Sequence, residues 1–214
     1  MKTILFVLGG KVVNNAPTSH FLLRTQAAVQ YCIDHPSEAV TIVVSGRWTS
    51  VTERYVDTEA EVAKQYILTQ LPEVTVVKED ISVELIGNYA FSKPLIAALS
   101  PDTVIIFTSE VNKPRNEVIA KRIFADDLPY KFNVITGEHS DNEVLVAKER
   151  DATTLFEAVF EHVEDGDDAA FRTTLLYKTP YYFKGIVDDK DFFDTYWQGG
   201  FENYISARES RKKL

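Results

Sequence analysis

Three loops in this chain combine small, polar and basic residues directly after short apolar runs. They are Gly9-Gly10, Ser45-Gly46-Arg47 and Thr108-Ser109. Glycine tolerates positive φ angles and lets a ligand approach the backbone closely. Four basic side chains lie in or just after these loops: Lys11, Arg47, Lys113 and Arg115. Such loops are typical of sites that bind phosphate or another small anion. The alternative is that these cations form ion pairs with Glu53, Glu59 or Glu110 on a solvated surface.

Two carboxylates, Glu59 and Glu61, are the candidate catalytic residues. They stand at the start of a predicted helix, where they could perform acid–base chemistry, coordinate a metal, or simply complement the helix dipole. Ser45 lacks the G-x-S-x-G context of a nucleophile elbow, and no histidine is placed by sequence as its base. His139 follows a predicted strand and could reach the same loops, with a surface position as the alternative.

Several well-defined motifs are missing from the sequence. Gly9-Gly10 does not continue into G-x-G-x-x-G, and there is no P-loop. The four histidines show no metal-ligand spacing, so no metal site is predicted. Cys32 is the single cysteine, which excludes a disulfide within the chain.

The elements that must position these loops are strands and helices in alternation. Short apolar or β-branched runs predict strands over residues 3–8, 40–44, 74–78, 103–107 and 132–136. Helical patterns with apolar stripes separate them. This alternation predicts an α/β fold with an open, mainly parallel, Rossmann-like sheet and helices on both faces.

Capping residues and prolines predict where the helices begin. Thr58 with Glu61 three residues later has the spacing of a capping box. We expect Ser82 to cap the third helix and Pro94 to kink or interrupt it, because proline removes a backbone donor. Pro114 suits the first turn of the fourth helix.

The character of the chain changes after Gly137. Leu155 to Val163 has the pattern of an amphipathic helix, and residues 164–168 form an acidic turn. Residues 171–204 contain eleven aromatic residues, including Tyr181-Tyr182-Phe183 and Tyr196-Trp197. We therefore predict a ligand-binding α/β domain over residues 1–150, and an aromatic-rich helical appendage packed on it over residues 151–214.

Composition narrows the choice of partner. A net charge of −9 over 214 residues opposes nucleic-acid binding, because phosphate backbones select basic faces. The apolar run Thr3–Leu8 is too short for a signal peptide or a membrane span. We expect a soluble, cytoplasmic protein without a membrane partner. The sequence leaves its oligomeric state open.

Parallel strands place their carboxyl ends at one edge of the sheet, and ligands bind there where the topology reverses. The three loops follow three predicted strands, so we expect them to meet at this edge. Helix N-termini beside them would offer N–H groups to an anion.

The landmarks also occur in a recognisable order. Phe6-Val7-Leu8-Gly9-Gly10 is followed by Arg24, Val44-Ser45-Gly46, Thr58-Glu59-Ala60-Glu61, Glu79-Asp80-x-Ser82, Asn88, and Thr108-Ser109 leading to Pro114-Arg115. This arrangement resembles the YdcF/SanA/ElyC family of Rossmann-like proteins over about residues 3–137. The C-terminal third lies outside the resemblance.

The resemblance implies a pocket and a class of ligand. The implied pocket residues are Gly9, Gly10, Ser45, Gly46, Glu59, Glu61, Asn88, Thr108 and Arg115. Members of the family have been linked to S-adenosylmethionine, which is therefore a candidate cofactor or ligand. The chain departs from the family pattern at Arg47, Leu85, Gly87 and Asn112. The family tends to have histidine at the position of Asn112, so this chain lacks the most obvious proton-transfer group.

Three functions remain open at this point. The first is an enzyme, a transferase or hydrolase, acting on a nucleotide-like or phosphorylated small molecule. The second is a module that senses such a ligand or S-adenosylmethionine without turnover. The third is a protein-interaction role for the C-terminal third. For the first two, the expected ligand-binding residues are Gly9, Gly10, Lys11, Ser45, Gly46, Arg47, Asn88, Thr108, Ser109, Asn112 and Arg115.

Overall fold

A five-stranded parallel sheet forms the centre of the computed structural model, which describes residues 1–47, 57–135 and 142–178. Its strands are β1 (Lys2–Val7), β4 (Ala39–Ser45), β5 (Thr75–Glu79), β6 (Thr103–Ser109) and β7 (Tyr130–Ile135). Their order across the sheet is β5-β4-β1-β6-β7, and every neighbouring pair is parallel. The sequence-based prediction of an open, Rossmann-like α/β fold is therefore confirmed.

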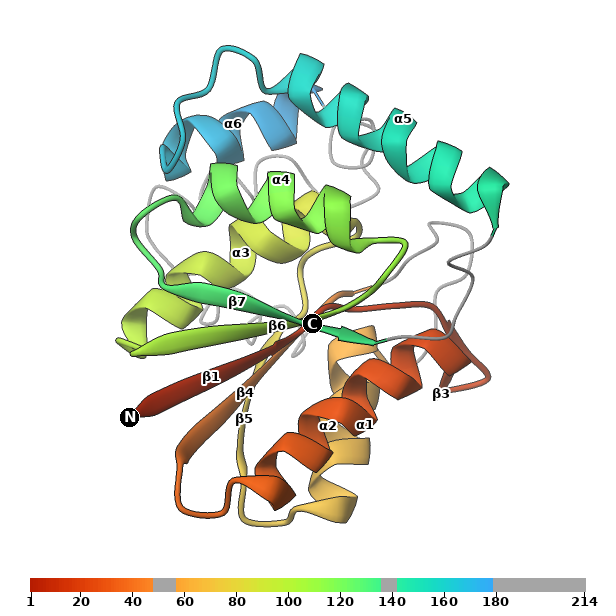
Figure 1. Cartoon of the computed structure of the whole chain (residues 1–214), viewed down its shortest axis with the longest axis vertical. Coiled ribbons are helices and arrows are strands. Elements are labelled where there is room, and N and C mark those ends of the chain that lie inside the picture. The colour runs from red at the N-terminus through yellow and green to blue at the C-terminus, as the bar shows by residue number, and fades with distance from the viewer. Residues whose placement is uncertain (48–56, 136–141, 179–214) are drawn as a thin grey trace, which may run out of the picture.

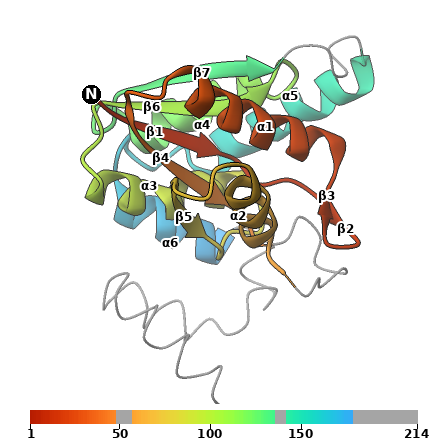
Figure 2. The same ribbon diagram turned by 90° about the horizontal axis from the view of Figure 1, so that it is seen from below.

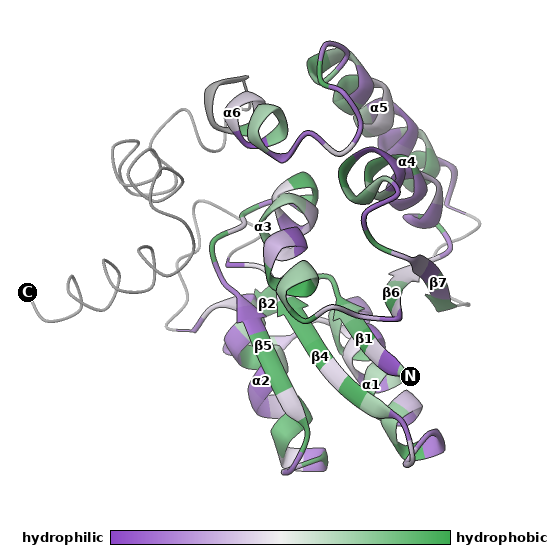
Figure 3. Cartoon of the chain, turned by 90° about the vertical axis from the view of Figure 1, so that its left-hand side faces the viewer, coloured by the Kyte–Doolittle hydropathy of each residue, from purple (hydrophilic) through white to green (hydrophobic). Residues whose placement is uncertain are grey.

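Helices cover both faces of this sheet (Figure 1). One face carries α1 (Ser19–Asp34) and α2 (Glu59–Gln70), and the other carries α3 (Leu85–Ala98) and α4 (Lys113–Phe124). Successive residues of β1 alternate between the two cores. Leu5 packs with α1 and α2, whereas Ile4 and Phe6 pack with α3 and α4, and all three are fully buried. Burial on both faces explains why the strands read as continuous apolar runs, as the hydropathy of β1 and β4 shows in Figure 3.

The order of the strands contains one reversal of direction. From β1 the chain moves outward to β4 and β5, then crosses back to β6 on the opposite side of β1. The loops that leave β1 and β6 therefore diverge, and a crevice forms between them at the carboxyl ends of the strands. This is the topological switch point of the sheet.

A small hairpin, not anticipated from the sequence, follows β1. It pairs β2 (Val12–Val13) with β3 (Ala16–Pro17), beyond the carboxyl end of β1 (Figure 2). Asn14 and Asn15 form its turn with φ angles of 53° and 57°, a conformation that asparagine tolerates better than most residues. Two-residue strands are too short to produce a periodic pattern, which is why they could not be predicted from the sequence.

The predicted helix starts have mixed outcomes. The Thr58 hydroxyl accepts a hydrogen bond from the Glu61 N–H at 3.1 Å, and Pro114 lies in the first turn of α4, as expected. The cap expected at Ser82 is wrong. Glu84 caps α3 instead, because its carboxylate accepts the N–H groups of Ile86 and Gly87.

The expected interruption at Pro94 is also wrong, since α3 runs through it from Leu85 to Ala98. Proline removes one hydrogen bond from a helix, but the tertiary packing on either side decides whether the helix survives. The neighbours Lys93 and Leu95 are both buried. We attribute the continuity of α3 to this packing.

Two further helices, α5 (Glu143–Val159) and α6 (Asp168–Lys178), extend the α3/α4 side. The predicted helix over Leu155–Val163 therefore begins earlier and ends earlier than expected. Phe156, Phe160 and Phe171 are buried in the same core as Phe6. The proposed boundary between residues 150 and 151 falls within α5. Residues 179–214, including Tyr181-Tyr182-Phe183 and Tyr196-Trp197, lie outside the described residues, as does His139.

Two basic side chains attach these helices to the sheet domain. Lys93 of α3 is buried and contacts Asp127 at 2.6 Å and Asp168, at the start of α6, at 2.8 Å. Arg122 of α4 donates a hydrogen bond to the backbone oxygen of Phe160 at 2.9 Å, and its guanidinium lies 5.6 Å from the Phe171 ring centroid. Within the described residues, none of the helices is both long and apolar enough to cross a membrane.

Candidate functional site

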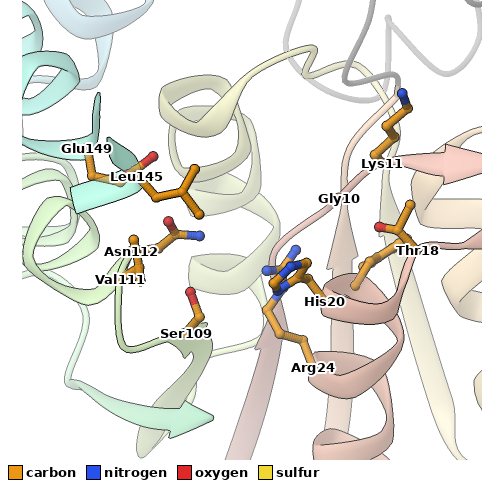
Figure 4. Close-up of a pocket in the computed structure, with 11 residues that line it drawn as sticks. Gly10, Lys11, Thr18, His20, Arg24, Ser109, Val111, Asn112, Leu145 and Glu149 are labelled. Atoms are coloured by element: carbon orange, nitrogen blue, oxygen red, sulfur yellow. The ribbon is translucent and has the colours of Figure 1, made fainter. Parts of the chain in front are cut away.

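A cavity of about 260 Å³ opens at the switch point (Figure 4). The loop after β1 and the start of α1 form one wall, with Lys11, Thr18, His20 and Arg24. The opposite wall comes from the end of β6, the start of α4 and α5, with Ser109, Val111, Asn112, Leu145 and Glu149. Leu145 and Glu149 of α5 both fall within residues 1–150, the predicted ligand-binding domain, although α5 itself runs across the predicted boundary. We call this space the first cavity.

A second cavity of about 240 Å³ adjoins the first. The two share Gly10, Arg24 and Asn112 in their linings. The remaining lining residues of the second cavity are Gly9, Glu59, Val83, Glu84, Leu85 and Asn88. The first cavity is bordered by Lys11, Arg24 and Glu149, among others. The second is bordered by two carboxylates, two amides and the shared Arg24. A ligand that spans both would meet basic groups in one part and acceptor-rich groups in the other.

Arg24 stands between the two cavities and organises the loop after β1. Its Nε donates to the Leu8 oxygen at 3.2 Å and its Nη2 to the Gly9 oxygen at 2.9 Å. Arginine remains charged at all physiological pH values, so this residue places a fixed positive charge at the site. Arg24 was not among the predicted ligand-binding residues. Its position on the buried face of α1, beside Phe21 and Ala28, is the sequence signal that could have revealed it.

The loops after β1 and β4 touch so closely that side chains are excluded. A Cβ atom on Gly9 would lie 2.4 Å from the Ser45 backbone oxygen and 2.5 Å from Glu59 Oε2. Gly46 has a φ of +119° and its own Cβ would also meet Glu59 Oε2 at 2.5 Å. The glycines therefore allow the Glu59 carboxylate to pack against backbone at the edge of the second cavity. The structure brings together Gly9, Gly46 and Glu59, three residues that the sequence predicted to meet.

Glu61 lies elsewhere, although it was predicted together with Glu59. Its carboxylate pairs with Lys78 and also accepts from Gln65. Burial alone would raise the pKa of Glu61, but the hydrogen bond and charge of Lys78 outweigh that effect and hold the pKa below its usual value. Glu61 lines neither cavity. Side chains two positions apart on a helix point in different directions, so Glu59 and Glu61 cannot face the same space.

The remaining predicted residues divide between the cavity walls and the layer behind them. Gly10, Lys11, Ser109 and Asn112 line the first cavity, and Asn88 lines the second. Ser45 is fully buried, and its hydroxyl has no hydrogen-bond partner among the described residues. Gly46 and Arg47 belong to neither lining, but their loop is held by backbone hydrogen bonds to Glu79 and Ser82.

Thr108 and Arg115 support the walls without lining them. The Thr108 hydroxyl accepts from Asn116, whose Oδ1 accepts in turn from the Tyr89 hydroxyl at 2.6 Å. Burial raises the pKa of Tyr89 well above its ordinary value, so it stays a neutral donor. Arg115 pairs at 3.4 Å with Glu149, which does line the first cavity. The charge of Arg115 is thus directed at a carboxylate of α5, a contact that sequence patterns could not reveal.

A buried carboxyl lies behind the second cavity. Glu79, at the end of β5, accepts the N–H groups of Ile81 at 2.6 Å and Ser82 at 2.8 Å, and it contacts the Ser82 hydroxyl. Burial raises the pKa of Glu79 to about 7, with a further contribution from the charge of Asp80, although the hydrogen bonds from Ser82 and Ile81 oppose the shift. The Ser82 hydroxyl also contacts Asn88 Oδ1, and Asn88 lines the second cavity.

No group of three or more metal-ligating side chains forms among the residues that the structure describes. Comparisons with models of protein families, with curated proteins and with solved structures find no match to this chain. The chemistry of the two cavities is therefore the basis for a functional assignment.

Proposed function

We propose that this protein binds a small anionic ligand, nucleotide-like or phosphorylated, across the two cavities at the carboxyl ends of β1 and β6. The observation that carries the proposal is the meeting of two uncapped helix N-termini at one cavity. Thr18 precedes α1 and Asn112 precedes α4, both line the first cavity, and neither caps its helix with its side chain. Helix N-termini attract anions through N–H groups and the helix dipole.

Three other helices, of which α5 also borders the first cavity, begin differently. Thr58, Glu84 and Asn142 cap α2, α3 and α5 through their side chains. Acidic residues stand in the first turns of α2 and α5, whereas α1 and α4 have none there. The N-termini of α1 and α4 thus lack the side-chain acceptors found at the starts of α2, α3 and α5. Lys11 and Arg24 add positive charge to the same place.

The second cavity favours a ligand that also carries hydroxyl groups. Carboxylates such as Glu59 and Glu84 accept hydrogen bonds from sugar hydroxyls, and the Asn88 amide can donate or accept. A ribose or other sugar attached to the anion satisfies both cavities. S-adenosylmethionine has a carboxylate and ribose hydroxyls that suit the same division. The resemblance to the YdcF/SanA/ElyC family supports this class of ligand.

If the protein turns its ligand over, Glu59 is the carboxylate that we assign to acid–base chemistry. It is the member of the predicted pair that lines a cavity. An enzyme with Glu59→Gln would lose turnover of a bound ligand, whereas a sensor has no turnover to lose. A measurement of product formation with each ligand that binds therefore separates a transferase or hydrolase from a module that only binds.

The first prediction concerns Lys11, an exposed residue of the first cavity. Replacement by alanine should weaken binding of a phosphorylated ligand by about tenfold, the effect of losing one charge-assisted hydrogen bond. Titration calorimetry with adenosine monophosphate, ribose 5-phosphate, inorganic phosphate and S-adenosylmethionine measures this. At about 100 times its dissociation constant, a ligand should also stabilise the fold by about 2.7 kcal/mol.

Lys121→Ala is the matched control, because it removes the same charge from an exposed position in the last turn of α4. The control should bind normally. Equal losses in the two variants would show that only net charge matters. Failure of all four compounds to bind would overturn the proposal.

A further inference from the structure

A chain of three buried polar side chains runs from the end of β5 to the second cavity. Glu79 is 1% exposed, Ser82 is fully buried and Asn88 is 6% exposed. The Ser82 hydroxyl contacts Glu79 Oε2 on one side and Asn88 Oδ1 on the other. Asn88 in turn lines the second cavity. A carboxyl that no ligand could touch directly is thus two contacts away from the proposed site.

The hydrogen bonds between Glu79, Ser82 and Asn88 need more hydrogens than the Ser82 hydroxyl alone supplies. The Ser82 hydroxyl carries one hydrogen, yet it lies between a carboxylate oxygen and an amide oxygen, both of which are acceptors. One hydrogen cannot serve two acceptors. Either Glu79 carries a proton and donates it to Ser82, or the Asn88 amide is turned so that its Nδ2 donates to Ser82.

We propose that Glu79 controls, through Ser82, whether Asn88 presents a hydrogen-bond donor or an acceptor to the second cavity. Asn88 is then a specificity-determining residue, and Glu79 and Ser82 are positioning residues that act through it.

The two states differ by one proton and one amide rotation. When Glu79 is protonated, its O–H donates to Ser82, the Ser82 hydroxyl donates to Asn88 Oδ1, and Nδ2 is directed to the cavity. When Glu79 is ionised, Ser82 donates to Glu79 instead. Asn88 Nδ2 then donates to Ser82, and Oδ1 is directed to the cavity. In both states the hydrogens between Glu79, Ser82 and Asn88 each have one acceptor, and the outer end of the Asn88 amide faces the second cavity.

Both states are accessible near neutral pH, since the pKa of Glu79 is raised to about 7. The elements packed around Glu79 carry five ionisable groups: Glu59 and Glu61 on α2, Glu84 at the start of α3, and Lys78 and Asp80 on its own strand and loop. Of these groups, Asp80 acts directly, and its charge raises the pKa of Glu79.

Binding of the proposed ligand should depend on pH in a defined direction. A ligand group that accepts a hydrogen bond from Asn88, such as a sugar hydroxyl whose own hydrogen is donated to Glu59 or Glu84, needs the donor and therefore the protonated form of Glu79. Binding of such a ligand should take up a proton, and its affinity should fall as the pH rises through about 7. This consequence rests on the proposed function, whereas the switch itself does not.

The experiment observes the switch without a ligand. Nuclear magnetic resonance follows the Asn88 side-chain amide, assigned with Asn88→Asp, and the Glu79 carboxyl carbon, assigned with Glu79→Gln. We expect the Asn88 amide signals to shift with pH and to share the midpoint of the Glu79 titration. In Glu79→Gln the shift should disappear, because glutamine accepts from Ile81 and Ser82 through Oε1 and donates permanently to the Ser82 hydroxyl through Nε2.

Ser82→Ala should uncouple the Asn88 amide from the Glu79 carboxyl. Glu79 should still titrate, while the Asn88 amide signals should no longer shift with pH. Ser92→Ala is the matched control. Ser92 is another fully buried serine, on the same helix as Asn88, and its hydroxyl has no hydrogen-bond partner among the described residues. An Asn88 amide that stays constant while Glu79 titrates in the unmodified protein would overturn the inference.

A second experiment, in which ligand binding is measured at two pH values, tests the switch and the proposed function separately. Affinity for adenosine monophosphate should be roughly tenfold lower at about pH 8.5 than at about pH 5.5, and should be independent of pH in Glu79→Gln once the ligand's own phosphate titration is subtracted. Coupled titration without any binding would refute the proposed function alone. Binding without coupled titration would refute the switch alone.

Discussion

Glu79 shows how far the fold can change a single ionisable group. An exposed glutamate is ionised at neutral pH, but Glu79 has lost nearly all contact with water and is held by the backbone of its own loop. Desolvation is the largest influence on its pKa, and it outweighs three hydrogen bonds that favour the charged form. The side chain that closes the turn after β5 therefore has a pKa in the neutral range.

The raised pKa of Glu79 predicts how stability depends on pH. The folded protein holds this proton more tightly than the unfolded chain, so the stabilising effect is complete below about pH 4.5 and is lost as the pH rises to about 7. With about 1.4 kcal/mol for each pH unit, the loss is roughly 3 kcal/mol. Urea unfolding of the unmodified protein and Glu79→Gln at several pH values measures it.

In Glu79→Gln this component of the pH dependence should vanish. Glu73→Gln is the control, because Glu73 is exposed in the turn before β5 and its replacement should leave the curve unchanged. Parallel stability curves for the unmodified protein and Glu79→Gln would contradict the assignment.

At the scale of elements, α6 is held to α3 by an unusual buried cation. The Lys93 ammonium bridges Asp127, before β7, and Asp168, at the start of α6, and also donates to the Gly166 oxygen at 3.3 Å. Its two carboxylate partners remain partly exposed. They can regain water if the lysine is removed, so the cost is smaller than for a fully buried pair.

Lys93→Met, which keeps the length of the side chain and removes its charge, should loosen α6. We expect a loss of about 1.5–3 kcal/mol, the range for hydrogen bonds to charged groups. Hydrogen exchange should accelerate in residues 168–178 more than in the central strands. Lys121→Met, on the exposed side of α4, should change neither the free energy of unfolding nor the hydrogen exchange of α6. Unaltered exchange in α6 after Lys93→Met would show that apolar packing alone holds the helix.

For the whole molecule, the described C-terminal helices and the sheet domain share one hydrophobic core. Phe156, Phe160 and Phe171 pack in the same cluster as Phe6 of the central strand. The Phe160 and Phe171 rings stack with centroids 5.3 Å apart. Because α5 also lines the first cavity through Leu145 and Glu149, the integrity of this core bears on the site as well as on stability.

A shared core predicts cooperative unfolding. Phe171→Ala should destabilise the protein by about 3–5 kcal/mol, while the denaturant curve keeps a single transition. Leu155→Ala is the comparison, since Leu155 is 65% exposed on α5 and its loss should cost less than about 0.5 kcal/mol. Two separate transitions, with the sheet domain unaffected by Phe171→Ala, would instead indicate an independent appendage.

Local patterns were sufficient for most of the architecture. Five apolar runs predicted the five strands, and Thr58 and Pro114 correctly indicated where α2 and α4 begin. A parallel arrangement then required the loops after β1 and β6 to share one edge. Gly9, Gly10 and Ser109 could be assigned to the site from the sequence for this reason.

The remaining features depend on contacts between residues far apart in the chain. Local spacing could not show that Glu59 reaches the second cavity while Glu61 pairs with Lys78, or that Arg115 contacts Glu149. Nor could it show that Glu84, rather than Ser82, caps α3, because Ser82 contacts Glu79 and Asn88 instead. Periodicity reports which face of an element is buried. The partner of each polar group, and with it the protonation of Glu79, depends on which elements fold against one another.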